Sequence, residues 1–138
     1  MAVSSSGYIL ALDLGQKRIG VAIASPIARI ASPYETLLND QDFPDKLKAI
    51  IEKEGVSDIV VGLPRGMAGQ ETEQTRSVRL MAEDIALSTK LPVVFQDESL
   101  TSVAAEQEMG ARGKIYAKAD IDKLAATLIL EDYLKQLG

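Results

Sequence analysis

The chain of 138 residues contains no cysteine and no histidine. Without cysteine it can form neither a disulfide nor a thiolate zinc site. Without histidine it lacks the commonest general base and the usual imidazole ligand of metal ions. Any bound metal would therefore be held by oxygen atoms, which favours a hard cation such as Mg²⁺ or Mn²⁺.

The sequence also lacks long apolar runs and an excess of positive charge. No apolar run approaches the roughly 18 residues that span a bilayer, and the first residues, MAVSSSGY, lack the basic and apolar regions of a signal peptide. The net charge of −5 is unlike that of a protein that coats nucleic acid. We expect a cytoplasmic protein with no membrane partner. The charge does not exclude an enzyme whose few cations cluster on one face.

The size and composition are those of one globular domain. Apolar residues make up 46% of the chain and charged residues 25%, which is close to the average of folded proteins. No repeat, linker or low-complexity stretch interrupts the sequence. We therefore expect a single domain over residues 1–138, with residues 1–6 as a loose tail.

Hydrophobic patterns predict a mixed α/β fold. Apolar segments at 9–13 and 19–24 flank the turn sequence LGQKR and indicate two strands, and a third is expected at 29–37, at a sheet edge or strand end because of Pro33. Further along, the patterns predict strands at 58–64 and 92–98 and helices at 43–54, 71–87, 99–109 and 120–136. This order predicts a five-stranded mixed sheet, a three-strand meander plus two parallel strands, with helices on both faces.

Carboxylates stand at the ends of these elements. Asp13 ends the first strand, Asp97 and Glu98 end the last strand, and Asp122 lies in the first turn of the last helix. If the first strand is central and the last helix begins at the same sheet edge, then Asp13, Glu98 and Asp122 converge. Three carboxylates repel one another until a divalent cation neutralises them, and a pair of such ions supports phosphodiester displacement without a histidine base.

Ordinary structural roles are the alternative. Asp is common in turns near glycine, and Asp13 stands two residues before Gly15. Asp120 is well placed to cap the last helix. Asp122 also suits the positive end of the helix dipole. However, Asp122 borders the predicted buried face, where a carboxylate without a partner is costly, and this favours a functional role for it.

Cations are expected near the same edge and could bind flanking phosphates. They are Lys17, Arg18, Arg65, Arg112, Lys114 and Lys118. A solvated surface charge is the alternative for each of them. Arg79 is expected to pair with Glu83, four residues later on the same helix.

Four segments, LALDLGQKRIGVAIA, IVVGLPRGMAGQE, FQDESLTSVAAE and IDKLAATLILEDYL, together resemble the YqgF/RuvX family. This resemblance implies a ribonuclease-H-like fold related to the Holliday-junction resolvase RuvC. Members are proposed to be nucleases for the 5′ end of precursor 16S rRNA, and were earlier proposed to resolve Holliday junctions. The acidic residues of the family correspond to Asp13, Glu98 and Asp122.

The sequence departs from the family pattern at two places. Ser99 follows Glu98 where the pattern has arginine, and residues 66–69 read Gly-Met-Ala-Gly where it has Asn-Met-Asp-Gly. The expected function is a Mg²⁺- or Mn²⁺-dependent nuclease acting on structured RNA, most simply precursor rRNA. A resolvase of branched DNA and an inactive module that binds RNA or the ribosome are the alternatives. An ATP-dependent phosphotransferase would need a second domain. The sequence indicates no oligomeric state.

Overall fold

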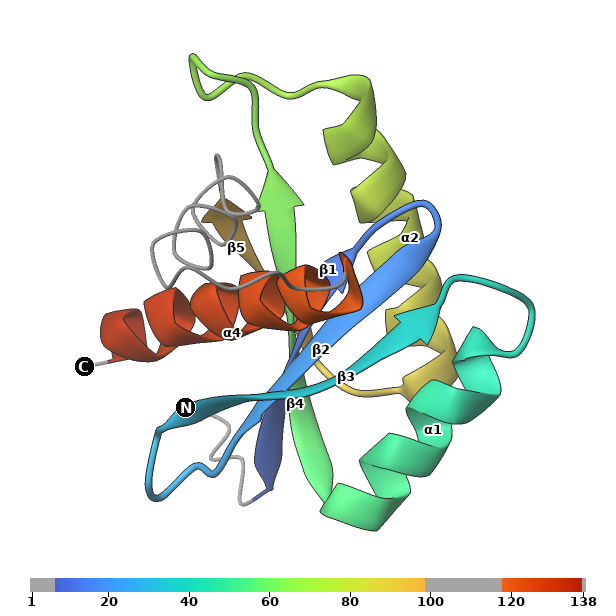
Figure 1. Ribbon diagram of the computed structural model, residues 1–138, viewed down its shortest axis with the longest axis vertical. Coiled ribbons are helices and arrows are strands. Elements are labelled where there is room, and N and C mark those ends of the chain that lie inside the picture. Colours follow the sequence, from blue (N-terminus) through green and yellow to red (C-terminus); the bar gives the residue numbers. More distant parts are fainter. Residues whose placement is uncertain (1–6, 99–117, 138) are drawn as a thin grey trace.

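The computed structural model describes residues 7–98 and 118–137 (Figure 1). These residues form one sheet with helices packed on it. In chain order the elements are β1 (Tyr8–Leu14), β2 (Arg18–Ala24), β3 (Ala31–Leu38), α1 (Phe43–Glu54), β4 (Val56–Pro64), α2 (Glu73–Thr89), β5 (Val93–Glu98) and α4 (Lys118–Leu137).

The five strands lie in the order β3-β2-β1-β4-β5, so that β1 is central. It pairs antiparallel with β2 and parallel with β4, and β5 continues the sheet parallel to β4. The strand with Pro33 is an edge strand, where a residue without an N–H is tolerated. The predicted meander followed by two parallel strands is confirmed.

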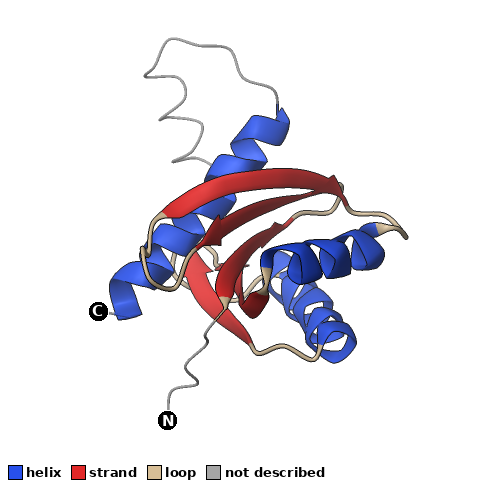
Figure 2. Cartoon of the chain, turned by 90° about the horizontal axis from the view of Figure 1, so that it is seen from below, coloured by secondary structure: helices blue, strands red, loops and turns tan. Residues whose placement is uncertain are grey.

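The helices cover opposite faces of the sheet (Figure 2). α1 and α2 pack on one face, where Leu47 of α1 and Ile85 of α2 join Leu12 of β1 in a core of large aliphatic side chains. α4 packs on the other face over smaller ones, among them Ala11 and Ala22. Small residues at this second interface let α4 approach the backbone of the sheet closely.

The ends of α1 and α2 follow from local sequence. α1 has a proline in its first turn and ends at Gly55, whose φ of 71° is the left-handed conformation that glycine adopts readily. α2 begins with a capping box, in which Thr72 and Thr75 exchange side-chain and backbone hydrogen bonds. The hydroxyl of Thr75 also donates to the carbonyl of Pro64, which fixes the start of α2 to the end of β4.

Most predicted elements are confirmed, but the buried stripe of α4 is only partly the expected one. Helical spacing in the sequence predicts a buried face of Ile121, Leu124, Ala125, Leu128 and Ile129. Ala125 and Ile129 are buried, together with Ala126, Leu130 and Leu134, whereas Ile121, Leu124 and Leu128 are only partly buried. The first turns of α4 lie at the sheet edge, so the helix enters the core only further along. The predicted tail 1–6 and helix 99–109 lie outside the described residues. Within the described part of the chain, no helix combines the length and apolar character needed to cross a membrane.

Candidate active site

Asp13 lies near the end of the central strand, between two glycines. It pairs with Gly20 of β2, and the parallel register places it level with Gly62 of β4. Side chains alternate along a strand, so Asp13 points to the same face as Ala11, which packs on the α4 side. The carboxylate therefore stands on the face covered by α4, with no side chain on either neighbouring residue.

The glycines allow α4 to lie directly on this part of the sheet. A Cβ atom on Gly20 would be 2.0 Å from the carbonyl oxygen of Asp122, and one on Gly62 would be 2.3 Å from Cδ1 of Ile129. Both distances are too short for a real Cβ atom. The close approach at Gly20 brings the first turns of α4, and Asp122 with them, to the end of β1.

Asp13 and Asp122, termed here the carboxylate pair, interact electrostatically. Burial, and to a smaller extent the charge of Asp122, raise the pKa of Asp13 from 3.8 to about 6. Negative charge at this position is therefore unfavourable until a cation compensates for it.

One protein cation already contacts the pair. Nε of Arg18 donates to Oδ2 of Asp122 at 2.6 Å, and both side chains are partly shielded from solvent. Arg18 is the first residue of β2, and its carbonyl accepts from the N–H of Gly15, which closes the β1–β2 turn. The turn that follows Asp13 thus positions Arg18 as the counter-ion of Asp122.

Glu98 lies at the same edge of the sheet. It ends β5 and pairs with Pro64, two residues beyond the level of Gly62 and Gln96. Strand alternation places it on the α4 face. In the described parts of the chain, no group of three or more acidic residues is arranged to hold a metal ion. The structure therefore brings Asp13 and Asp122 together, and the three-carboxylate metal site stays a prediction.

The predicted phosphate-binding cations have different surroundings. Lys17 is exposed in the β1–β2 turn, whereas Arg18 and Arg65 are engaged by acidic side chains. Arg112 and Lys114 lie outside the described residues. Lys118 is the first residue of α4, and its side chain also lies outside the described part.

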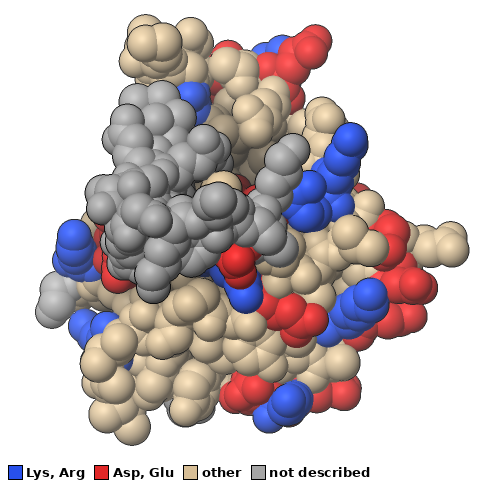
Figure 3. Space-filling view, in the orientation of Figure 1, with Lys and Arg blue, Asp and Glu red and all other residues tan. Residues whose placement is uncertain are grey.

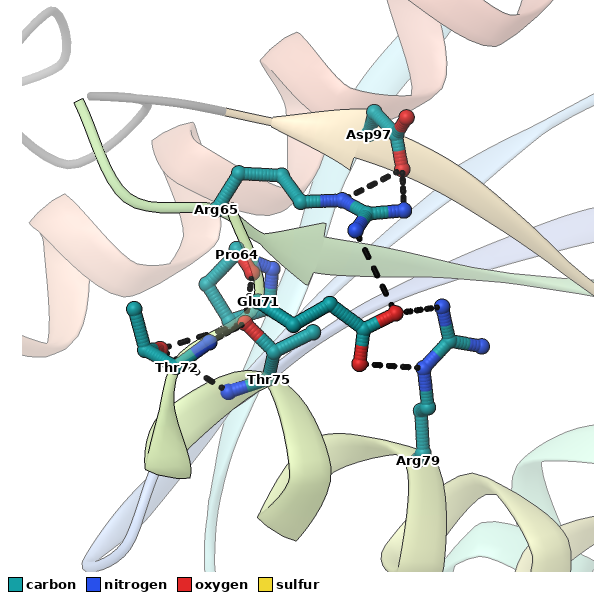
Figure 4. A network of polar contacts seen from close by, with 7 residues as sticks. All are labelled: Pro64, Arg65, Glu71, Thr72, Thr75, Arg79 and Asp97. Carbon is teal, nitrogen blue, oxygen red and sulfur yellow. Dashed lines mark hydrogen bonds and ion pairs between the residues drawn. The ribbon is translucent and has the colours of Figure 1, made fainter. Parts of the chain in front are cut away.

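Arg65, Glu71, Arg79 and Asp97 form an ion-pair cluster, termed here the arginine network, on the opposite face of the sheet edge (Figure 4). Arg79 binds Glu71 with both Nε and Nη2, and its guanidinium lies 5.3 Å from the ring centre of Phe95. The expected partner Glu83 is thus replaced by a residue ahead of the helix. Spacing along a helix could not reveal this pair, because Glu71 precedes the N-cap of α2.

Acidic and basic side chains are interspersed on the face seen in Figure 3. This distribution agrees with the net charge of −5.

The sequence from residue 7 to residue 136 matches the family described as "RuvX: Holliday junction resolvase". The chain belongs to the RuvX family. This assignment rests on nearly the whole chain, and the predicted family resemblance is confirmed.

Curated relatives cover the chain at high identity. A protein of Chloroflexus aurantiacus named "Putative pre-16S rRNA nuclease" is 44% identical over 132 residues, covering 91% of this chain and 85% of the relative. A protein of the same name from Sulfurihydrogenibium sp. is 38% identical over 132 residues, covering 94% of this chain and 91% of the relative.

Solved structures share the fold at low sequence identity. RuvC of T. thermophilus, solved in complex with a Holliday junction substrate, aligns with a TM-score of 0.57 at 14% identity, covering 94% of this chain and 96% of that chain. A second structure of Thermus thermophilus RuvC aligns with a TM-score of 0.51 at 12% identity, covering 95% of this chain and 96% of that chain. The expected RuvC-like, ribonuclease-H-like fold is therefore confirmed.

In this RuvX chain, Gln70 packs inside the β4–α2 loop, where residues 66–69 depart from the family pattern. The N–H of Gly66 donates to the carbonyl of Gln70, and the N–H of Ala68 donates to the Gln70 side chain. A Cβ atom on Gly66 would be 2.3 Å from the Gln70 side chain. Gln70 therefore occupies the space that a side chain at position 66 would need, while Met67 at the tip is 92% exposed. Ser99 lies outside the described residues.

Proposed function

We propose that this RuvX chain is a divalent-metal-dependent nuclease, a single domain over residues 1–138 that processes the 5′ end of precursor 16S rRNA. Asp13, Asp122 and Glu98 would hold Mg²⁺ or Mn²⁺. An rRNA substrate would place this activity in the cytoplasm, on free RNA or on the ribosome.

The carboxylate pair is the observation that carries the proposal. Two carboxylates from distant parts of the chain interact at the end of the central strand. Burial, and to a smaller extent the charge of Asp122, raise the pKa of Asp13. A hard cation bound by carboxylate oxygens would offset the cost of this negative charge. The donor set therefore fits a divalent ion, and Glu98 stands on the same face of the same edge.

Each residue has a distinct task in this proposal. A bound divalent ion would lower the pKa of a coordinated water and stabilise the charge that develops on the phosphate. Asp13 is fixed by the central strand, and Asp122 is fixed by the contact of its backbone with Gly20. Lys17 and Arg18 of the β1–β2 turn, with Arg112, Lys114 and Lys118, would bind the flanking phosphates.

The substrate is inferred from the relatives. The names of the curated relatives point to pre-16S rRNA, whereas the family description names a Holliday junction resolvase. We favour the RNA substrate because the more similar sequences carry that name. Branched DNA is the second candidate.

The experiment tests cleavage and substrate together. Purified protein is incubated with Mn²⁺ and with either a labelled RNA carrying a 5′-extended 16S end or a labelled four-way DNA junction. Asp13→Asn should abolish cleavage, because the substitution removes an anionic ligand without changing shape. Asp58→Asn is the matched control, since Asp58 stands at the opposite end of β4 and accepts a hydrogen bond from its neighbour Ser57.

The outcomes separate the alternatives. RNA cleavage that is lost only in Asp13→Asn supports the proposal. Junction cleavage alone would move the protein to branched DNA. Binding of RNA without cleavage by the unaltered protein would contradict the nuclease proposal and favour a binding module.

A further inference from the structure

The arginine network connects the ends of β4 and β5 with the start of α2. Arg65 directly follows β4, Glu71 precedes α2, Arg79 is in α2, and Asp97 is in β5. Asp97 is adjacent in sequence to Glu98 but points to the opposite face. The network therefore contacts the end of β5 on the face opposite to the Glu98 side chain.

The guanidinium of Arg65 is occupied on two sides. Its Nε and Nη2 atoms both lie 3.3 Å from Oδ1 of Asp97, and its Nη1 atom lies 3.3 Å from Oε2 of Glu71 (Figure 4). The side chain is only 21% exposed. A phosphate that approached the Nε–Nη2 side of this guanidinium would have to displace Asp97.

The backbone of Arg65 holds the same strand end. Its N–H donates to the carbonyl oxygen of Glu98 at 3.3 Å, in the last rung between the chain of β4 and that of β5. Arg65 thus contacts two consecutive residues of β5, Asp97 through its side chain and Glu98 through its backbone. Movement of Glu98 away from β4 would have to break both contacts.

Glu71 and Arg79 fix the position of Arg65 in turn. Glu71 bridges the two arginines, and its two contacts with Arg79 measure 3.2 and 2.7 Å. Hydrogen bonding to Arg79 is the main cause that lowers the pKa of Glu71, so this carboxylate stays charged. Arg79 also lies against the ring of Phe95, on the same face as Asp97.

We propose that Arg65 is a positioning residue, which holds Glu98 at the sheet edge through Asp97 and the Glu98 carbonyl and does not bind the phosphate backbone. This inference replaces the phosphate-binding role expected for Arg65 and rests on the proposed function for Glu98. Partners that orient a metal ligand typically change metal affinity or activity about 10- to 100-fold when removed.

The two roles of Arg65 predict opposite kinetics. A positioning residue acts on the geometry of Glu98, so its loss lowers kcat and weakens Mn²⁺ binding while KM for RNA stays the same. A phosphate ligand acts on RNA, so its loss raises KM and reduces the salt dependence of RNA binding, with Mn²⁺ binding unchanged.

The test combines three variants with a readout that needs neither metal nor RNA. Asp97→Asn should accelerate hydrogen exchange of the Arg65 amide, measured by NMR in chelator. Arg65→Gln should weaken Mn²⁺ binding, measured by calorimetry, about tenfold. Arg65→Lys should recover only part of this loss, because lysine keeps the positive charge but lacks the planar, bidentate guanidinium group. The matched control is Arg29→Gln, an exposed arginine between β2 and β3, which should change neither quantity.

Each outcome is decisive. Unchanged amide exchange in Asp97→Asn together with unchanged Mn²⁺ affinity in Arg65→Gln would overturn the positioning role, as would a rise in KM alone. If the unaltered protein cleaves no RNA, the nuclease proposal fails, but the amide-exchange result still decides whether the network holds the end of β5.

Discussion

The two charged clusters at one sheet edge are built in opposite ways. The carboxylate pair lies on the α4 face, has an excess of negative charge, and contacts Arg18. The arginine network lies on the α2 face and contains two arginines and two acids, of which all but Arg65 are more exposed than Arg18 and Asp122. One cluster is electrostatically costly and the other is internally neutral.

This difference separates the two kinds of work that charges do in a protein. Ion pairs near water contribute little to stability, because solvent and salt screen them. Their value here is geometric, since they connect β4, β5 and α2. A partly buried carboxylate beside another is retained at a cost, which is typical of functional groups. This contrast supports our proposals of binding chemistry for the carboxylate pair and of a positioning role for the network.

The largest expected effect comes from separating the carboxylate pair. Gly20→Ala puts a methyl group where the backbone carbonyl of Asp122 lies, so α4 must move away from β2. We expect cleavage to fall by more than tenfold and the free energy of unfolding to fall by about 1–3 kcal/mol, the usual cost of overpacking. Cleavage assays and denaturant unfolding measure the two effects.

Gly62→Ala is the matched control on the neighbouring strand. Its methyl group would meet the end of the Ile129 side chain, which can change rotamer while the backbone of α4 stays in place. We expect a smaller loss of activity than in Gly20→Ala. Equal losses would show that the approach of α4 at Asp122 is not what the activity depends on.

The next effect is on the pH dependence of stability without metal. The pKa of Asp13 is raised from 3.8 to about 6 in the folded protein, so the folded state binds this proton more tightly than the unfolded state. The stabilisation is complete below pH 3.8 and is lost as the pH rises through about 6. Asparagine does not titrate, so the Asp13→Asn variant does not lose this stabilisation as the pH rises. The variant should therefore gain up to about 3 kcal/mol relative to the unaltered protein between pH 4 and pH 7.

Denaturant unfolding of both proteins in chelator, at several pH values, gives this difference directly. Titrating groups that do not interact with Asp13 cancel because both proteins carry them. A constant difference across the range would contradict the raised pKa of Asp13 and weaken the contrast between the two clusters.

The fold could be predicted from the sequence, and so could two residues of the candidate site, Asp13 and Asp122. Period-two and period-3.6 patterns locate the strands and helices, and Pro33 correctly indicates the edge strand. Asp13 and Asp122 are recognisable because each is a carboxylate at the border of an apolar segment, where burial demands a partner. In the structure the backbone of Asp122 lies against Gly20, which pairs with Asp13, and the charge of Asp122 acts on Asp13.

The contacts of the arginines could not be predicted, because they depend on loops. Glu71 reaches Arg79 only because the chain turns at Thr72 before α2 begins. Arg65 reaches Asp97 only because β4 and β5 are adjacent and in register. Neither relation has a signature in residue spacing, so sequence alone offers a phosphate-binding role for Arg65 and a helical pair for Arg79.

The smallest expected effect compares one arginine from each cluster. Arg18→Gln removes the 2.6 Å contact with Asp122, which is partly shielded from water, and leaves that carboxylate beside Asp13 without its counter-ion. We expect a loss of about 1–2 kcal/mol in the free energy of unfolding.

Arg79→Gln makes the same chemical change in the exposed network, where we expect a smaller shift of the denaturation midpoint that disappears at high salt. The Arg18→Gln shift should persist at high salt, because shielded pairs are screened less. Equal shifts with equal salt dependence would mean that both clusters behave as ordinary surface ion pairs, and the assignment of binding chemistry to only one of them would lose its electrostatic basis.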